Sequence, residues 1–171
     1  HTYSRIVNQR DLFRRELEPL AEEELSPELL QEDEWRGEAI AWPDPQVCAS
    51  FLPQPMQGRG ADLVSLAVLN AAREPTLHVE QGEQVSFFYA LRFPQPLFAD
   101  AAAGILLVDK YNQVVHGKDS QQYQHALPTY LPAGSMVRFQ QQLRLDIQPG
   151  EYVVRVWCYQ WQEGRKHTLF S

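Results

Sequence analysis

Apolar and polar residues alternate one by one over much of the chain from about residue 61 onward, and this period of two limits what the chain can fold into. Successive side chains of a β-strand point to opposite faces of a sheet, so the alternation is typical of strands that bury one face. The 12 prolines and 11% aromatic residues also favour strands over a helical bundle. We therefore expect an antiparallel β domain.

Turn residues divide this region into about six strands. They are expected at 62–69, 84–93, 104–109, 114–117, 136–147 and 151–162. The predicted core rows are Val85, Phe87, Tyr89, Leu91 and Phe93 in one strand, and Val137, Phe139, Leu143, Leu145 and Ile147 in another. Asn112 is expected to supply the left-handed residue of the turn between 109 and 114. Because no helix is expected between these strands, the predicted fold class is all-β: an immunoglobulin-like or jelly-roll antiparallel β-sandwich.

The front of the chain differs, and we predict an acidic helical linker at 1–50 before a β-sandwich domain at 51–171. Apolar residues between Tyr3 and Leu20 recur at helical spacing, and Ser26-Pro27-Glu28 is typical of a helix start. Residues 1–46 hold 12 acidic and 5 basic residues, whereas residues 47–171 hold 10 of each. The net charge of -7 therefore comes from the front, where Glu22 to Glu34 is expected to be a solvated face.

Several partner classes are disfavoured by composition. A domain without net charge and an acidic N-terminal segment provide no basic surface for a phosphate backbone, so we expect no nucleic acid partner. No stretch approaches the roughly eighteen apolar residues of a membrane-spanning helix, so we expect a soluble protein. Cys48 and Cys158 share no metal-ligand spacing and are expected to be buried free thiols in a reducing compartment. The chain begins with His1 and not Met, so we expect it to be part of a longer protein.

Catalytic motifs are not found in the sequence. It has no G-x-x-x-x-G-K-[ST] loop, no H-E-x-x-H helix and no G-x-S-x-G elbow. Gly58 to Gly60 is expected to be a turn, and Asp109 with Asp119 is not expected to be a glycosidase pair. We predict a protein that is not an enzyme and holds no cofactor and no metal.

The last predicted strand carries the strongest sign of function. Tyr152, Val154, Val156 and Cys158 form one row, and Val153, Arg155, Trp157, Tyr159 and Trp161 form the other. The smaller apolar row suits a packed interior, with the Tyr152 hydroxyl returning to the backbone as in a tyrosine corner. The other row then faces outward and forms a ladder of aromatic rings, spaced about 7 Å apart along the strand.

Such a ladder suits carbohydrate, because a pyranose has an apolar C–H face and a rim of hydroxyl groups. Arg138, Gln140, Gln142 and Arg144 form the outward row of the strand at 136–147 and would supply polar groups if that strand neighbours the last one. The predicted glycan-binding residues are Arg155, Trp157, Tyr159, Trp161, Arg138, Gln140, Gln142 and Arg144. The competing interpretation is that the helical linker or another subunit covers the aromatic face.

The order of several segments resembles a known family. These segments are Gly60 to Val64 running into Leu66 to Asn70, Gln81 to Val85, Gly104 to Asp109, Val114 to Ser120, and Pro149 to Tyr152. Together they resemble the C-terminal domain of Wzt-type ATPase subunits of O-antigen ABC transporters, over roughly residues 55 to 162.

The resemblance implies a β-sandwich that recognises bacterial O-antigen, the polysaccharide of lipopolysaccharide, in the cytoplasm and couples it to export. It implies a homodimer, usually with an exchanged terminal strand. It also implies an ATPase domain in the parent protein, and through that protein the transporter's membrane subunit and the inner membrane as partners. The alternative is a structural dimerisation β-sandwich appended to an ATPase or a glycan-modifying enzyme. Solvent exposure of Trp157 and Trp161 separates the two hypotheses.

Overall fold

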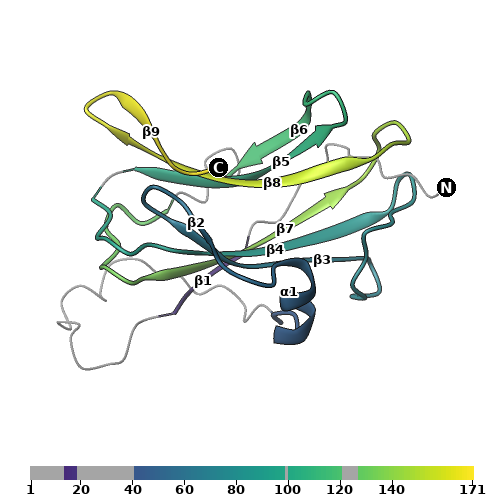
Figure 1. Cartoon of the computed structure of the whole chain (residues 1–171), viewed down its shortest axis with the longest axis horizontal. Coiled ribbons are helices and arrows are strands. Elements are labelled where there is room, and N and C mark those ends of the chain that lie inside the picture. The colour runs from purple at the N-terminus through teal and green to yellow at the C-terminus, as the bar shows by residue number, and fades with distance from the viewer. Residues whose placement is uncertain (1–13, 19–40, 99, 121–126) are drawn as a thin grey trace.

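The computed structural model describes residues 14–18, 41–98, 100–120 and 127–171, and it arranges them as nine strands and one helix (Figure 1). The elements are β1 (Arg14–Glu18), α1 (Pro45–Phe51), β2 (Met56–Gln57), β3 (Asp62–Leu69), β4 (Gln84–Arg92), β5 (Ala101–Asp109), β6 (Val114–Asp119), β7 (Met136–Arg144), β8 (Tyr152–Gln162) and β9 (Arg165–Phe170).

The strands form two antiparallel sheets that face each other. One sheet has the order β1-β7-β4-β3-β2 and is called the β4 sheet here, and the other has the order β6-β5-β8-β9 and is called the β8 sheet. In Figure 1 the β8 sheet forms the upper layer and the β4 sheet the lower one, with α1 below it. This arrangement confirms the predicted all-β sandwich.

The core lies between the two sheets and contains the predicted inward rows. All five predicted residues of the β4 row, from Val85 to Phe93, are at most 2% exposed. Tyr89 stacks on Phe139 of β7 with ring centroids 4.8 Å apart, and Cys158 of β8 belongs to the same core cluster. Burying a side chain of this size stabilises the fold by about 1.5–3 kcal/mol. The alternation of β4 and β7 therefore assigned their core faces correctly.

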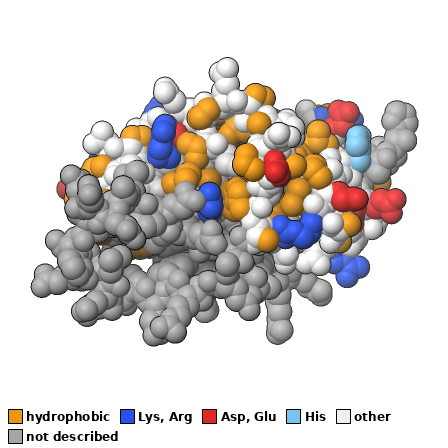
Figure 2. Space-filling model, turned by 90° about the horizontal axis from the view of Figure 1, so that it is seen from below, with side chains coloured by type: hydrophobic (Ala, Val, Ile, Leu, Met, Phe, Trp, Pro, Cys, Tyr) orange, Lys and Arg blue, Asp and Glu red, His pale blue; other side chains and the backbone are white. Residues whose placement is uncertain are grey.

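A second, smaller core lies on the outer face of the β4 sheet. Phe88 points away from the main core but is 0% exposed, because it packs with Cys48 of α1 and meets the ring of Trp42 edge-on at 5.5 Å. Asp44 caps α1 by accepting a hydrogen bond from the Gln46 backbone N–H at 2.7 Å. Figure 2 views the molecule from this side and shows hydrophobic side chains with Lys and Arg among them. The predicted domain boundary after residue 50 falls inside α1.

Residues 14–18 correct part of the predicted helical linker. They form β1, which pairs with β7 in the antiparallel register Arg14↔Gln140 to Glu18↔Met136. Without β1, β7 would be the edge of its sheet, where unpaired N–H and C=O groups favour an added strand over a helix. The remainder of the predicted helices, within 1–13 and 19–40, lies outside the described residues.

The turns use the residue types that their geometry requires. Asn112 has a φ of 63° in the β5–β6 turn, as predicted. The Asp109 carboxylate accepts hydrogen bonds from the backbone N–H groups of Tyr111 and Gln113 at 2.9 and 2.8 Å, so it holds this turn together. The Tyr152 hydroxyl donates to the Gln148 carbonyl at 2.6 Å, which confirms the expected tyrosine corner.

On one side of the sandwich the two sheets are joined through the turn between β2 and β3, which contains glycines. The backbone N–H groups of Gly60 and Ala61 donate to the Leu169 carbonyl of β9 at 3.0 and 3.2 Å. A Cβ on Gly58 would clash with the Ala61 carbonyl oxygen and lie 2.6 Å from that of Leu169. Glycine at 58 therefore lets a turn of the β4 sheet approach the last strand of the β8 sheet.

We expect Cys158 to resist thiol reagents until the domain unfolds. Its side chain is 0% exposed, and burial raises the pKa of its thiol from the ordinary 9.0 to about 12. At pH 8 the reactive thiolate is then about a thousandfold scarcer than for an ordinary thiol. The unfolded thiol ionises first, so the stability linked to this group is complete below about pH 9 and declines as pH rises further.

Timed iodoacetamide labelling with mass spectrometry, in buffer and in urea, measures this protection. Cys48 is also buried and free, at 8% exposure, and serves as the internal comparison. Rapid labelling of Cys158 in the native protein would contradict the placement of β8.

Within the part of the chain that the structure describes, no helix has the length and apolar character needed to cross a membrane.

Candidate functional site

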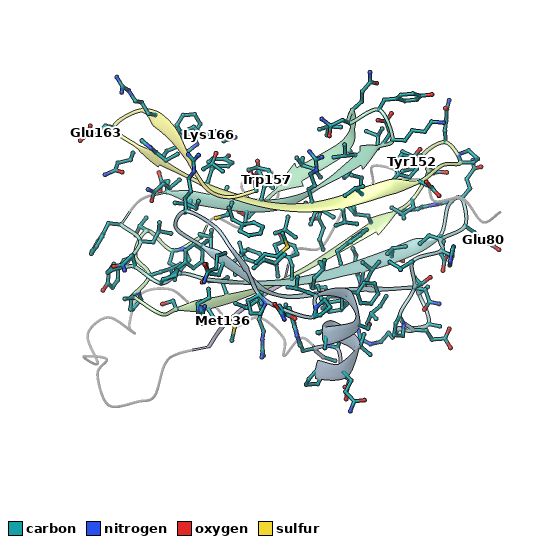
Figure 3. The ribbon with its side chains drawn as sticks, in the orientation of Figure 1. Glu80, Met136, Tyr152, Trp157, Glu163 and Lys166 are labelled. Atoms are coloured by element: carbon teal, nitrogen blue, oxygen red, sulfur yellow. The ribbon has the colours of Figure 1, made fainter. Side chains whose placement is uncertain are left out.

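The outer face of the β8 sheet carries the aromatic residues that the sequence singled out. Val156 and Cys158 of β8 are 4% and 0% exposed and face the core, whereas Val153 and Trp161 are 56% and 44% exposed. The side chains of Trp157, Tyr159 and Trp161, called the aromatic row here, share the outer face. Figure 3 shows Trp157 on the side of β8 that faces away from the β4 sheet. The predicted face assignment of β8 is therefore correct.

The rings of the aromatic row pack on one another. Trp157 and Tyr159 stack with centroids 5.0 Å apart and planes 6° apart, and Trp161 meets Tyr159 edge-on at 6.0 Å. The row is therefore tighter than the expected spacing of about 7 Å, because the side chains lean toward each other. Tyr159 in the middle is only 6% exposed, so Trp157 and Trp161 form the accessible ends.

Lys166 of β9 borders the aromatic row and was not predicted. The β8–β9 register places Trp161 opposite Lys166. The Lys166 ammonium lies 3.7 Å from the ring centroid of Tyr159 and 5.1 Å from that of Trp157, within the range of cation–π attraction. Figure 3 shows Lys166 on the hairpin beside this face. The site thus includes the positive charge of a lysine, carried on a flexible side chain, directly over its rings.

Asp119 of β6 fixes the central ring. A hydrogen bond between the Tyr159 hydroxyl and the Asp119 carboxylate is one of the causes that raise the pKa of Tyr159. Burial and then the Asp119 charge raise the pKa of Tyr159 above its ordinary value, so the hydroxyl stays protonated at neutral pH. In β5, between β6 and β8, register places Ala102 opposite Tyr159 and Gly104 opposite Trp157. Small residues there leave room for the rings.

The indole of Trp157 carries a hydrogen-bond donor without a partner in the part of the chain that the structure describes. This donor, Nε1, is buried. A buried donor without an acceptor costs about 1–3 kcal/mol.

Arg155 lies on the same outer face, nearer the β5–β6 turn. Its guanidinium donates a hydrogen bond of 2.7 Å to the side-chain oxygen of Asn112, so it is held beside that turn. Four of the predicted glycan-binding residues, those of β8, are thus brought together on one surface.

The other four predicted residues, on β7, do not join them. β7 lies between β1 and β4 in the opposite sheet. Its outward side chains therefore point away from the core on the opposite face of the sandwich. Arg138 lies 5.1 Å from the Trp42 ring, Gln140 is 6% exposed, Gln142 accepts from Gln84 at 3.4 Å, and Arg144 lies 4.0 Å from Asp146. The condition that this strand neighbours β8 is wrong, and these residues cannot form a rim around the aromatic row.

Comparisons with known proteins follow this geometry. No curated protein matches the sequence. A solved structure described as the crystal structure of the C-terminal domain of Wzt superposes with a TM-score of 0.58 at 16% identity, covering 68% of this chain and 72% of that one. The sequence profile of the Wzt C-terminal domain matches residues 57–170, from β2 to the end of β9. The chain therefore belongs to the Wzt C-terminal domain family.

Proposed function

We propose that this domain is a non-catalytic carbohydrate-binding module that recognises a bacterial O-antigen polysaccharide for export by an ABC transporter. The observation that carries the proposal is the aromatic row on an outer sheet face, with the charges of Lys166 and Asp119 around it. Rings and polar groups alternate there over a short distance, which is the combination that sugar recognition requires.

The physical chemistry of a sugar fits this surface. The C–H face of a pyranose can cover an exposed ring, and burying roughly 100 Å² of apolar surface yields roughly 2.5 kcal/mol before ordering costs are subtracted. Ring hydroxyls can accept from the Lys166 ammonium. Each contact is weak, so affinity would come from several rings and donors acting together.

The family supplies the biological setting of the proposal. As a Wzt-type domain the chain is a part of a transporter subunit that is distinct from the ATPase part. We place the parent protein on the cytoplasmic face of the inner membrane, bound to the transporter's membrane subunit. A homodimer would present two glycan sites to one polymer, and the second contact would raise weak affinity through effective concentration.

A structural dimerisation domain is the second candidate, and exposed apolar side chains on the same face favour it. Val153 and Trp161 are 56% and 44% exposed, and Val114 of β6 is 57% exposed. Apolar residues spread over one sheet face also suit contact with another subunit. In that case the aromatic row would be buried between two chains and closed to sugars.

Titration calorimetry of the domain with O-antigen polysaccharide from its source strain tests the proposal. The expected result is saturable binding with a Kd in the micromolar to millimolar range. The polysaccharide should be recovered intact after the titration. Sedimentation of the same sample gives the mass. A dimer that binds no polysaccharide would favour the structural alternative, and a single-chain mass would contradict the homodimer.

A further inference from the structure

An exposed pair of aromatic rings lies outside the aromatic row, where the chain continues past β4. The backbone groups of Leu97 and Leu131 exchange two hydrogen bonds, of 2.9 and 3.0 Å. Phe93 is likewise bonded to Ser135 and Gly134, at 2.8 and 2.7 Å. The β4–β7 pairing thus resumes beyond the strand ends, and it places Phe98 directly opposite Tyr130.

Alternation points this pair outward. Leu97 and Leu131 are 4% and 2% exposed and belong to the main core. The neighbouring side chains face the other way: Phe98 is 74% exposed and Tyr130 is 37% exposed. Their ring centroids are 5.0 Å apart and their planes 37° apart. Two buried leucines therefore hold two adjacent rings out in solvent.

Prolines restrict the backbone that supports this pair. Pro94 and Pro96 precede Phe98, and Pro128 and Pro132 flank Tyr130, so four φ angles near the pair are fixed. A surface of large apolar side chains on a fixed backbone loses little conformational entropy when a ligand covers it. A ligand that covers Phe98 would therefore pay a smaller entropic cost than one that covers a ring on a flexible loop.

The pair lies next to one end of the aromatic row. The Trp161 backbone N–H donates to the Asp100 carbonyl at 2.8 Å. Phe98 precedes Asp100 by two residues, so their Cα atoms are at most about 7 Å apart. Trp161 is the exposed end of the row on that side.

We propose that Phe98 and Tyr130 form a second aromatic platform for the same polysaccharide, so that the module contacts a longer stretch of the chain than the aromatic row covers. This inference rests on the proposed function. Two rings offer far less area than the roughly 800 Å² per partner of a stable protein interface, but they match the face of a sugar ring. The backbone of this pair reaches Trp161 through Asp100, so a polymer that follows the end of the sandwich from Trp161 would meet these rings next.

Fragments of the polysaccharide of graded length test this inference. O-antigen from the source strain is released from its lipid by mild acid, separated by size, and titrated into the domain and its F98A and Y130A variants. Y111A is the matched control, because Tyr111 is 73% exposed but lies in the β5–β6 turn. We expect long fragments to bind the unaltered domain about tenfold more tightly than short ones. F98A and Y130A should each remove most of that gain and leave the affinity for short fragments unchanged. Y111A should change neither the gain nor the affinity for short fragments.

The outcomes separate the two proposals. If F98A and Y130A both keep the full gain with length, or if the unaltered domain shows no gain, the second platform is wrong while glycan binding stands. If no fragment binds the unaltered domain, the proposed function itself fails. If F98A lowers the sedimentation mass and leaves the length effect intact, the pair is a contact between subunits and not a sugar platform.

Discussion

Replacing Val156 with Asp is expected to unfold the domain, whereas the same change three residues earlier, at Val153, should be tolerated. Val156 is 4% exposed, lies opposite Ile105 of β5, and belongs to the main core. A carboxylate there would be buried without a partner, which costs several kcal/mol on top of the lost apolar contact. That loss is comparable to the whole stability of a domain of this size.

Val153 is the matched control because it is the same residue type in the same strand. Its side chain is 56% exposed on the outer face, so a charge at this position stays in water. We expect V153D to change the free energy of unfolding by less than about 1 kcal/mol. Urea unfolding followed by far-ultraviolet circular dichroism measures both variants. A folded V156D with a collapsed V153D would mean that the faces of β8 are inverted.

Strand alternation was the most informative part of the sequence, because it depends only on one strand and its burial. It located β3, β4, β7 and β8 and most of β5 and β6, and it separated Val156 from Trp157 correctly. Asn112 and Tyr152 were predictable for a similar reason, since each acts through the backbone of its own turn. Features that are set within about ten residues could be predicted from the sequence.

The order of strands could not be predicted in the same way. Alternation states that Gln140 and Trp157 both face outward, but it does not state from which sheet. β7 pairs with β4 and β8 pairs with β5, so the two outward rows lie on opposite sides of the sandwich. The split of the predicted glycan residues follows from this pairing, which depends on contacts far apart in the sequence.

Two elements that were not predicted, β9 and α1, are preceded by recognisable turn and cap residues in the sequence. Glu163 and Gly164 both have positive φ, at 51° and 71°, in the tight turn before β9, and an X-Gly pair between strands is a hairpin signal. That turn would have placed Lys166 beside Trp161. Asp44-Pro45 starts α1 with the same cap and proline pattern that was read at Ser26-Pro27. β9 lacked alternation because most of it is an exposed edge.

Substituting Trp157 by Ala should weaken polysaccharide binding by one to two orders of magnitude, about 1.4 to 2.8 kcal/mol, with little loss of stability. The variant removes the outer ring of the stack, but the core row behind it is unchanged. W42A is the matched control, since Trp42 packs on Phe88 and under Arg138 on the opposite sheet. Its loss should lower the free energy of unfolding by about 2 kcal/mol and leave affinity unchanged. Calorimetric titration and urea unfolding of both variants give the four values required. If W42A weakens binding and W157A does not, the recognition surface lies on the β4 sheet, and the aromatic row has a structural role.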